Sequence, residues 1–288
     1  MIHLGRWEIE SIVCGRFRLD GGAMFGVVPK TLWERGADVD DQNRVLLANR
    51  ALIAWHKASG RILIADTGTG TKWNSVDAER YAIESTPNAI DDALEKRGAS
   101  ADDVTDVIVT HLHFDHCGGM TVWADEPGGP TRLRFPKARH WVHRRHWEHA
   151  HRPTLRDRAS FLAIDFDVLG QSNTLEFVDG DQPNSSIDDI EWMISNGHTP
   201  AQLLPRFLGG EDANLLFVGD MVPTAPHLPL PWVMAYDLHP LTTLAEREAT
   251  YEQCRREGLR LAFPHDPEHG VVAVEFDGRK VHIEESFA

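Results

Sequence analysis

Apolar and polar side chains alternate along much of the first third of the chain, which is the pattern of half-buried β-strands. The alternation, together with short apolar runs, predicts strands at residues 7–13, 16–19, 44–48, 51–56, 61–65 and 107–110. The last two segments are apolar almost throughout, which indicates strands that are buried on both faces. The N-terminal part of the chain is therefore predicted to form a sheet inside the protein.

A helix is predicted at about residues 87–97, with Thr86 as its cap, Pro87 at its first position and Gly98 at its end. A second helix is predicted at about residues 241–257. The remaining strands of the second half are predicted at residues 174–178, 190–194, 203–208, 215–218, 259–263, 271–276 and 280–283.

Each half of the chain therefore combines several strands with at least one helix. An αββα sandwich, in which two mixed β-sheets pack face to face with helices on the outer faces, would explain this order. Periodicity alone does not separate this α/β architecture from other layered ones. Because no repeat, low-complexity tract or interdomain linker interrupts the chain, we expect a single domain over residues 1–288.

The charge balance limits the partners that the protein can have. Acidic residues outnumber basic ones by 44 to 29, so the formal net charge is −15. A field of this sign repels phosphate backbones and anionic lipid surfaces. We therefore expect no nucleic-acid partner and no membrane partner, and a small neutral substrate fits better.

The cysteines and the start of the chain indicate a reducing compartment. Cys14, Cys117 and Cys254 are odd in number and widely spaced, which is typical of neither a disulfide framework nor a thiolate zinc site. The first residues lack the basic and then apolar pattern of a signal peptide, and no window of ~18 apolar residues is long enough to span a membrane. The expected location is cytoplasmic.

Four side chains of metal-binding type lie within the six residues His111-Leu112-His113-Phe114-Asp115-His116. His111 and His113 are two residues apart and project to the same side of an extended chain. Asp115 and His116 come where the chain turns, so they can face a second point nearby. Two glycines follow, which allow the backbone to pack closely.

Three further candidates follow apolar strands and enter loops shaped by glycine or proline. His198 lies in Gly-His-Thr-Pro, Asp220 in Val-Gly-Asp, and His265 in Phe-Pro-His. Each alone is more typical of an ordinary polar residue than of a ligand. Together with the six-residue motif, they predict a centre for two metal ions.

This ordered set of motifs resembles the metallo-β-lactamase superfamily over about residues 7–285. The resemblance implies that His111, His113 and His198 bind one divalent metal ion, that Asp115, His116 and His265 bind the other, and that Asp220 bridges them. Asp66 matches the buried aspartate that orients a ligand in this family. Two zinc ions are implied, although manganese, iron and cobalt suit the same ligands.

A closer resemblance links the chain to lactonases, above all the YtnP-like quorum-quenching N-acyl homoserine lactonases. It lies in residues 19–30 and 231–237, which contain apolar side chains in loops. These side chains are predicted to line a substrate channel, or to pack in the core: Met24, Phe25, Trp232 and Met234. The apolar loop at residues 24–29 could equally serve as a dimer interface, so a homodimer is a further expectation.

The resemblance implies that a hydroxide bridging the two metal ions attacks the lactone carbonyl. Asp115 and Asp220 would keep the geometry and move the proton. Some related lactonases place a substrate-binding tyrosine three residues after the bridging aspartate, but here that position is Pro223. Tyr236 and His227 are the candidates to replace it.

Other functions stay open at this point. The same centre could hydrolyse aryl esters or organophosphates, and the fold also hosts persulfide dioxygenases, oxidoreductases with a single iron. A group of histidines near the middle of the chain is interpreted as a solvated, partly helical surface, because arginines lie among them. Its members are His140, His143, His146, His149 and His151.

Overall fold

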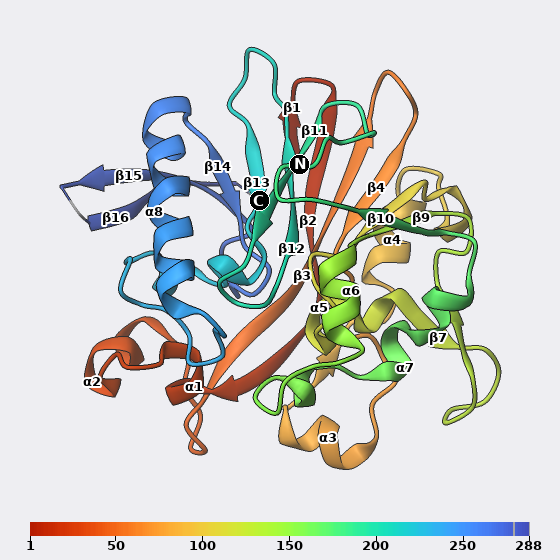
Figure 1. Ribbon diagram of the computed structural model, residues 1–288, viewed down its shortest axis with the longest axis horizontal. Helices are drawn as coiled ribbons and strands as arrows, with labels where there is room; N and C mark the ends of the chain where they lie inside the picture. Colours follow the sequence, from red (N-terminus) through yellow and green to blue (C-terminus); the bar gives the residue numbers. More distant parts are fainter. Residues whose placement is uncertain (279, 288) are drawn as a thin grey trace.

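The computed structural model describes residues 1–278 and 280–287, and two β-sheets make up its centre (Figure 1). The first sheet contains β1 (Ile2–Leu4), β2 (Trp7–Asp20), β3 (Arg44–His56), β4 (Ile62–Ala65), β5 (Glu84–Ser85), β6 (Asp106–Ile108), β9 (Arg139–His143) and β10 (Leu175–Val178). The second sheet contains β11 (Ile190–Ser195), β12 (Gln202–Phe207), β13 (Leu215–Phe217), β14 (Arg260–Ala262), β15 (Val271–Asp277) and β16 (Lys280–Phe287). A separate two-stranded sheet contains β7 (Thr121–Trp123) and β8 (Thr131–Leu133).

The helices are short, apart from the last one. They are α1 (Gly21–Phe25), α2 (Lys30–Trp33), α3 (Ser75–Arg80), α4 (Ala89–Glu95), α5 (Phe114–Cys117), α6 (Arg144–Ala150), α7 (Ala163–Phe166) and α8 (Pro240–Glu257). In Figure 1, α8 lies beside the second sheet, whereas α4, α5 and α6 lie on the opposite side of the molecule. None of the helices in the described ranges has both the length and the apolar character that crossing a membrane requires.

Three apolar cores separate four layers of structure. Leu63 of β4 packs with Phe217 of β13 between the two sheets. The next residue, Ile64, points to the other face of its sheet and packs with Leu94 of α4. A third core joins the second sheet to Tyr251 of α8. The predicted αββα sandwich is therefore confirmed, with both sheets containing parallel and antiparallel pairs.

The two longest strands differ from the prediction. The predicted break between residues 13 and 16 is a β-bulge at Gly15, which keeps β2 continuous. A side chain at Gly15 would approach the carbonyl oxygen of Glu84 to 2.7 Å, so glycine suits this position. Likewise, β3 runs without a break through Asn49 and Arg50, because both are buried and paired with β2.

Both predicted helices exist with shifted boundaries. The first begins at Ala89 rather than at residue 87, and Asn88 occupies the capping position instead of Thr86. The second begins at Pro240 and ends before Gly258, which adopts the left-handed conformation with φ 63°. The glycine allows the chain to reverse directly into β14.

The sheet topology brings the candidate ligands to one edge. β4 runs parallel to β6, and β13 runs parallel to β14, so the carboxyl ends of each pair lie together. Asp66 directly follows β4, and His111 comes shortly after β6. Asp220 and His265 follow β13 and β14 in the same way. Ligands that are far apart in the sequence therefore meet where these strands end.

Candidate metal centre

The structure brings all seven predicted ligands together in a buried cluster. Three groups of side chains each place their ligand atoms within 4.8 Å of one another. The groups are His111, His113 and His198; His111, His116 and Asp220; and Asp115, His116 and His265. The first and third groups match the two ligand sets that the sequence resemblance implies.

Asp220 lies between these two ligand sets. Its Oδ2 atom is 3.3 Å from Nε2 of His198 and 4.0 Å from Nε2 of His111. Its Oδ1 atom is 3.2 Å from Nε2 of both His116 and His265. Each carboxylate oxygen therefore faces a different set, which is the arrangement of a bridging ligand.

The electrostatics of the cluster favour a charged Asp220 and divide the imidazoles into two kinds. Although burial opposes it, Asp220 and other carboxylates raise the pKa of His116 and of His198. Burial alone would raise the pKa of Asp220, but His116, His265 and His198 together lower it well below its usual value. Burial and neighbouring imidazoles hold the pKa of His111 and of His113 well below the usual histidine value. A carboxylate and neutral imidazoles are the forms that bind metal ions.

Unsatisfied nitrogen atoms test whether the residues fit a metal ion. Nε2 of His111 is buried and has no hydrogen-bond partner among the described residues, and Nδ1 of His113 faces the cluster at 3.2 Å from Nε2 of His198. Nε2 of His265 lies 3.0 Å from Nε2 of His116 while Nδ1 of each ring already has an acceptor, so two neutral rings would bring lone pairs together at this point. Buried polar atoms are rarely left without a partner, and cations at these points would satisfy them. The residues therefore fit divalent metal ions.

Other side chains orient the imidazoles from behind. Asp66 is almost fully buried and lies 2.7 Å from Nδ1 of His116, while its carboxylate also accepts from the backbone N–H and the hydroxyl of Thr110, each at 2.8 Å. Nδ1 of His265 donates to the carbonyl of Ala48 at 2.9 Å. Because Nδ1 of each of these two rings is hydrogen-bonded, Nε2 faces the cluster and the tautomer of the ring is fixed.

Asp237 makes the corresponding contact to His198 and was missed at the sequence level. Its Oδ1 atom is 3.0 Å from Nδ1 of His198, and its side chain is almost fully buried. It lies in the segment 231–237 that resembles the lactonases, but nothing in its local sequence distinguishes it from a surface aspartate. Asp237 is 39 residues from His198 in the sequence, and the fold brings the two side chains together.

The glycines after the motif allow the close packing that the sequence predicts. A side chain on Gly118 or Gly119 would collide with the backbone of Thr69 or Thr67, respectively. This contact accompanies a hydrogen bond of 2.7 Å from the N–H of Thr67 to the carbonyl of His116. The loop that carries the six-residue motif therefore packs closely against the loop that follows β4.

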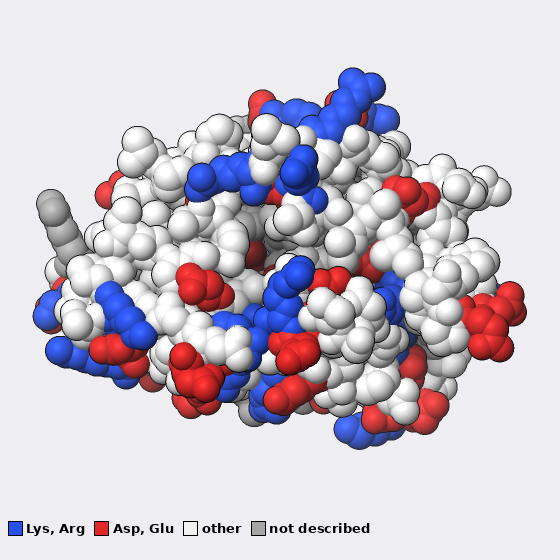
Figure 2. All heavy atoms as spheres, turned by 90° about the horizontal axis from the view of Figure 1, so that it is seen from below, with Lys and Arg blue, Asp and Glu red and all other residues white. Residues whose placement is uncertain are grey.

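A cavity of about 380 Å³ opens onto the cluster. Met24, Met234 and Tyr236 line it, as predicted, and Leu19, Tyr81, Phe114, Arg156 and Ser160 also contribute. Figure 2 views the molecule from below Figure 1 and shows this end hollowed near its centre, with basic side chains beside the hollow. The cleft is therefore largely apolar apart from the ligand cluster and a few polar residues at its wall.

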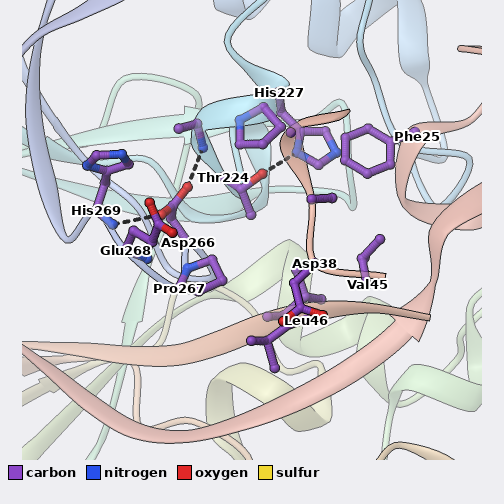
Figure 3. Close-up of a pocket in the computed structure, with 15 residues that line it drawn as sticks. Phe25, Asp38, Val45, Leu46, Thr224, His227, Asp266, Pro267, Glu268 and His269 are labelled. Carbon is purple, nitrogen blue, oxygen red and sulfur yellow. Dashed lines mark hydrogen bonds between the residues drawn. The ribbon is translucent and has the colours of Figure 1, made fainter. Parts of the chain in front are cut away.

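The structure directs Phe25, His227 and Trp232 away from that cleft, so the prediction that they line it is wrong; Phe25 and Trp232 take the alternative and pack in an apolar cluster. Phe25 and His227 line a neighbouring cavity of about 420 Å³, shown in Figure 3. Their rings stack with centroids 4.6 Å apart, and Trp232 meets Phe25 edge-on at 6.0 Å. The three aromatic rings pack beside α1, which carries Met24, so they support the cleft wall from outside.

His227 has both ring nitrogens occupied. Nδ1 lies 2.6 Å from the hydroxyl of Thr224, and Nε2 lies 2.9 Å from the carbonyl of Met24. Burial lowers the pKa of His227 to about 3, which keeps the ring neutral. It therefore supports the loop between β13 and α8 rather than facing a substrate.

The interpretation of the central histidines as a solvated surface is wrong. His140, His143 and His146 are buried, and only His151 is exposed. The reason is that β9 lies inside the first sheet, between β6 and β10, and α6 turns one face toward the metal-binding loops. His149 is half-buried and lies 2.6 Å from Asp157, which lines the cleft.

The cysteines behave as the sequence predicts. Cys14, Cys117 and Cys254 all lie in the described part of the chain and are free. Cys117 directly follows the motif but is fully buried in the core around α4, and burial raises its pKa well above the usual thiol value. It is therefore a packed residue rather than a nucleophile.

The chain belongs to the metallo-beta-lactamase superfamily, whose family model matches residues 51–250, well over half of its length. Among solved structures, it is similar to a probable metal-dependent hydrolase from Staphylococcus aureus, with 25% identity, a TM-score of 0.84 and 100% of both chains covered. No curated protein matches the sequence.

Two further structural neighbours carry names that bear on the reaction. AidC, a dizinc quorum-quenching lactonase in complex with the product N-hexanoyl-L-homoserine, has 20% identity and a TM-score of 0.77, with 100% of this chain and 97% of that chain covered. An N-acyl homoserine lactone hydrolase with the same product bound at its catalytic metal centre has 18% identity and a TM-score of 0.67, with 93% and 95% covered. At these identities the likeness shows the fold alone.

Proposed function

We propose that this member of the superfamily is a dinuclear hydrolase that opens lactone rings of the N-acyl homoserine lactone type. The observation that carries the dinuclear part is the position of Asp220, whose two oxygens face separate ligand sets. The apolar cleft beside the cluster supports an acylated substrate. We propose zinc as the metal, because imidazole and carboxylate ligands suit it.

The proposed metal ions would supply a water of lowered pKa and a Lewis acid for the lactone carbonyl. His111, His113 and His198 would hold one ion, and Asp115, His116 and His265 the other. Asp220 would hold both. These side chains are buried and oriented from behind, so the centre would need little rearrangement when substrate arrives.

The cleft wall supports an acyl chain rather than a charged substrate. Met24, Phe114 and Met234 present apolar surface close to Asp115 and His265 in the same cavity. Met side chains adapt to chains of different length because they are unbranched and flexible. A lactone ring at the cluster would then leave its acyl chain along this wall.

Tyr236 is the proposed partner of the substrate's polar groups. It lines the cleft and is 37% exposed, and burial together with the nearby carboxylates Asp20 and Asp115 raises its pKa well above the usual phenol value. A phenol with this pKa stays neutral at neutral pH and donates a hydrogen bond rather than a proton.

The Tyr236→Phe variant is expected to bind metal normally and to lose about tenfold in kcat/KM, because one hydrogen bond of roughly 1.4 kcal/mol is removed. Steady-state kinetics and metal analysis of the same preparation test this. A wild-type kcat/KM would exclude Tyr236 from substrate binding, and a Tyr81→Phe variant is the matched control at the same cleft.

Proton release during hydrolysis tests the proposed function directly. When metal-loaded protein meets a long-chain N-acyl homoserine lactone in a lightly buffered solution, we expect rapid acidification. The signal should vanish after treatment with a chelator and return when zinc is added back.

Two other results would each point to a different function. Absence of acid release from protein that carries two metal ions would contradict the lactonase proposal and favour aryl-ester or organophosphate substrates. A content of one iron per chain, without hydrolysis, would favour a persulfide dioxygenase instead.

A further inference from the structure

The first ligand set is built from two separate chain segments. His111 and His113 come from the loop after β6, whereas His198 comes from the loop between β11 and β12. A backbone hydrogen bond connects the two segments, because the N–H of Leu203, near the start of β12, donates to the carbonyl of Thr110 at 2.8 Å. The rings of His113 and His198 meet at 3.2 Å between Nδ1 and Nε2, so any further bond between the two segments helps to hold them in register.

His146 of α6 provides such bonds. Its Nε2 atom accepts a hydrogen bond of 2.7 Å from the backbone N–H of Leu112, the residue between the two histidine ligands. Its Nδ1 atom lies 2.9 Å from the carbonyl of Pro200, two residues after His198. The side chain is completely buried, so water does not compete for either bond.

These partners determine the tautomer of His146. A backbone N–H can only donate and a backbone carbonyl can only accept, so Nε2 must carry the lone pair and Nδ1 the proton. A single neutral imidazole therefore bonds to both loops at once. Its ring centroid is 6.0 Å from that of His111, with the planes at 81°, so it lies directly behind the ligand set without belonging to any candidate metal-binding group.

We propose that His146 is a positioning residue that holds the loops of His111, His113 and His198 together, and so sets the metal affinity of this ligand set selectively. The other set, Asp115, His116 and His265, is oriented by Asp66 and by the carbonyl of Ala48, whereas the hydrogen bonds of His146 go to Leu112 and Pro200. The proposal rests on the proposed metal centre and is independent of the substrate.

Two variants, each with only one intact ligand set, allow metal binding to the two sets to be measured separately. His265→Ala disables the second set and leaves the first, whereas His113→Ala does the reverse. In each background, the binding constant for Co²⁺ is measured from its d–d absorption and from competition with a chromophoric chelator, with and without His146→Leu. Leucine fills a similar volume but can neither accept from Leu112 nor donate to Pro200.

We expect His146→Leu to weaken Co²⁺ binding by about 10- to 100-fold in the His265→Ala background, the usual effect of removing an outer hydrogen bond, and to change its spectrum. In the His113→Ala background, binding should change by less than about threefold, well below that effect. His146→Gln should recover part of the loss, because its amide can again accept from Leu112. His151→Gln, on the exposed end of the same helix, is the matched control and should have no effect.

Unchanged binding in the His265→Ala background, or equal losses in both backgrounds, would overturn the proposal. If His146→Leu fails to fold, His146→Gln carries the test, and wild-type affinity and spectrum in both backgrounds would then overturn it. Because metal binding is measured without substrate, a failure of the lactonase proposal would leave this result unaffected.

Discussion

The Asp220→Ala variant is expected to lose bound metal and hydrolytic activity together. The two carboxylate oxygens of Asp220 face different ligand sets, at 3.2 Å from Nε2 of His116 and 3.3 Å from Nε2 of His198. Its removal takes away the negative charge that would lie between the two metal ions, and two cations in close proximity are then disfavoured. A loss of several kcal/mol of metal-dependent stabilisation corresponds to a fall in kcat/KM on the order of 10³-fold.

Metal analysis and lactone hydrolysis on the same sample measure this prediction. Asp179→Ala removes an exposed carboxylate that pairs with Arg144, and it should leave both quantities unchanged. A fully active Asp220→Ala protein with two metal ions per chain would show that Asp220 does not bridge them. Asp220→Asn, which preserves the shape, should reproduce the loss if charge is the cause.

The Asp66→Asn variant is expected to weaken metal binding and to unfold more easily even without metal. Asp66 has a left-handed backbone conformation with φ 54°, which asparagine tolerates, so the change tests the carboxylate rather than the backbone. Asparagine directs an amide N–H₂ toward either Thr110 or His116, where the aspartate accepts hydrogen bonds. The orientation of His116 is then lost, which should reduce metal affinity about 10- to 100-fold.

The same substitution should lower the free energy of unfolding of the metal-free protein by about 2–3 kcal/mol, because buried polar groups lose their partners. Urea denaturation after chelation measures this, and a metal titration measures the affinity. Asp103→Asn is the control, because Asp103 is an exposed carboxylate that accepts from Ser100. Wild-type affinity of Asp66→Asn would contradict the role of Asp66 in orienting His116.

Local sequence patterns located the strands and helices, but they did not show where a strand continues through an apparent break. The strand segments on either side of Gly15 were visible as alternation, but β2 is one strand because the bulge is accommodated by pairing with β3 and β5. Pairing partners lie outside any local window, so a break and a bulge have the same local signature. The helix at Ala89–Glu95 was recognisable from its flanking Pro and Gly, but its first residue depended on the loop before it.

The histidines of α6 show that a polar residue type does not by itself predict exposure to solvent. Arginines at 144 and 145 project to solvent and pair with Asp179 and Asp181, as a surface helix should. The next residue, His146, faces the interior, where the ligand loops offer it one donor and one acceptor. Only the packing of α6 against those loops distinguishes the two faces.

The sequence by itself determined the ligand types, their order and the family, because four of the seven lie in one short motif and the others each follow an apolar strand. Alternation and helix signals are local, so the sequence also indicated layers of strands and helices, but periodicity alone did not separate the αββα sandwich from other layered architectures. The tertiary structure alone decided which side chains stand behind the ligands and which apolar residues face the cleft. Asp237 and His146 reach their partners across 39 and 34 residues, and Phe25 turns away from the cleft while Met24 lines it. Such contacts depend on how distant strands and loops pack, and no local pattern encodes that.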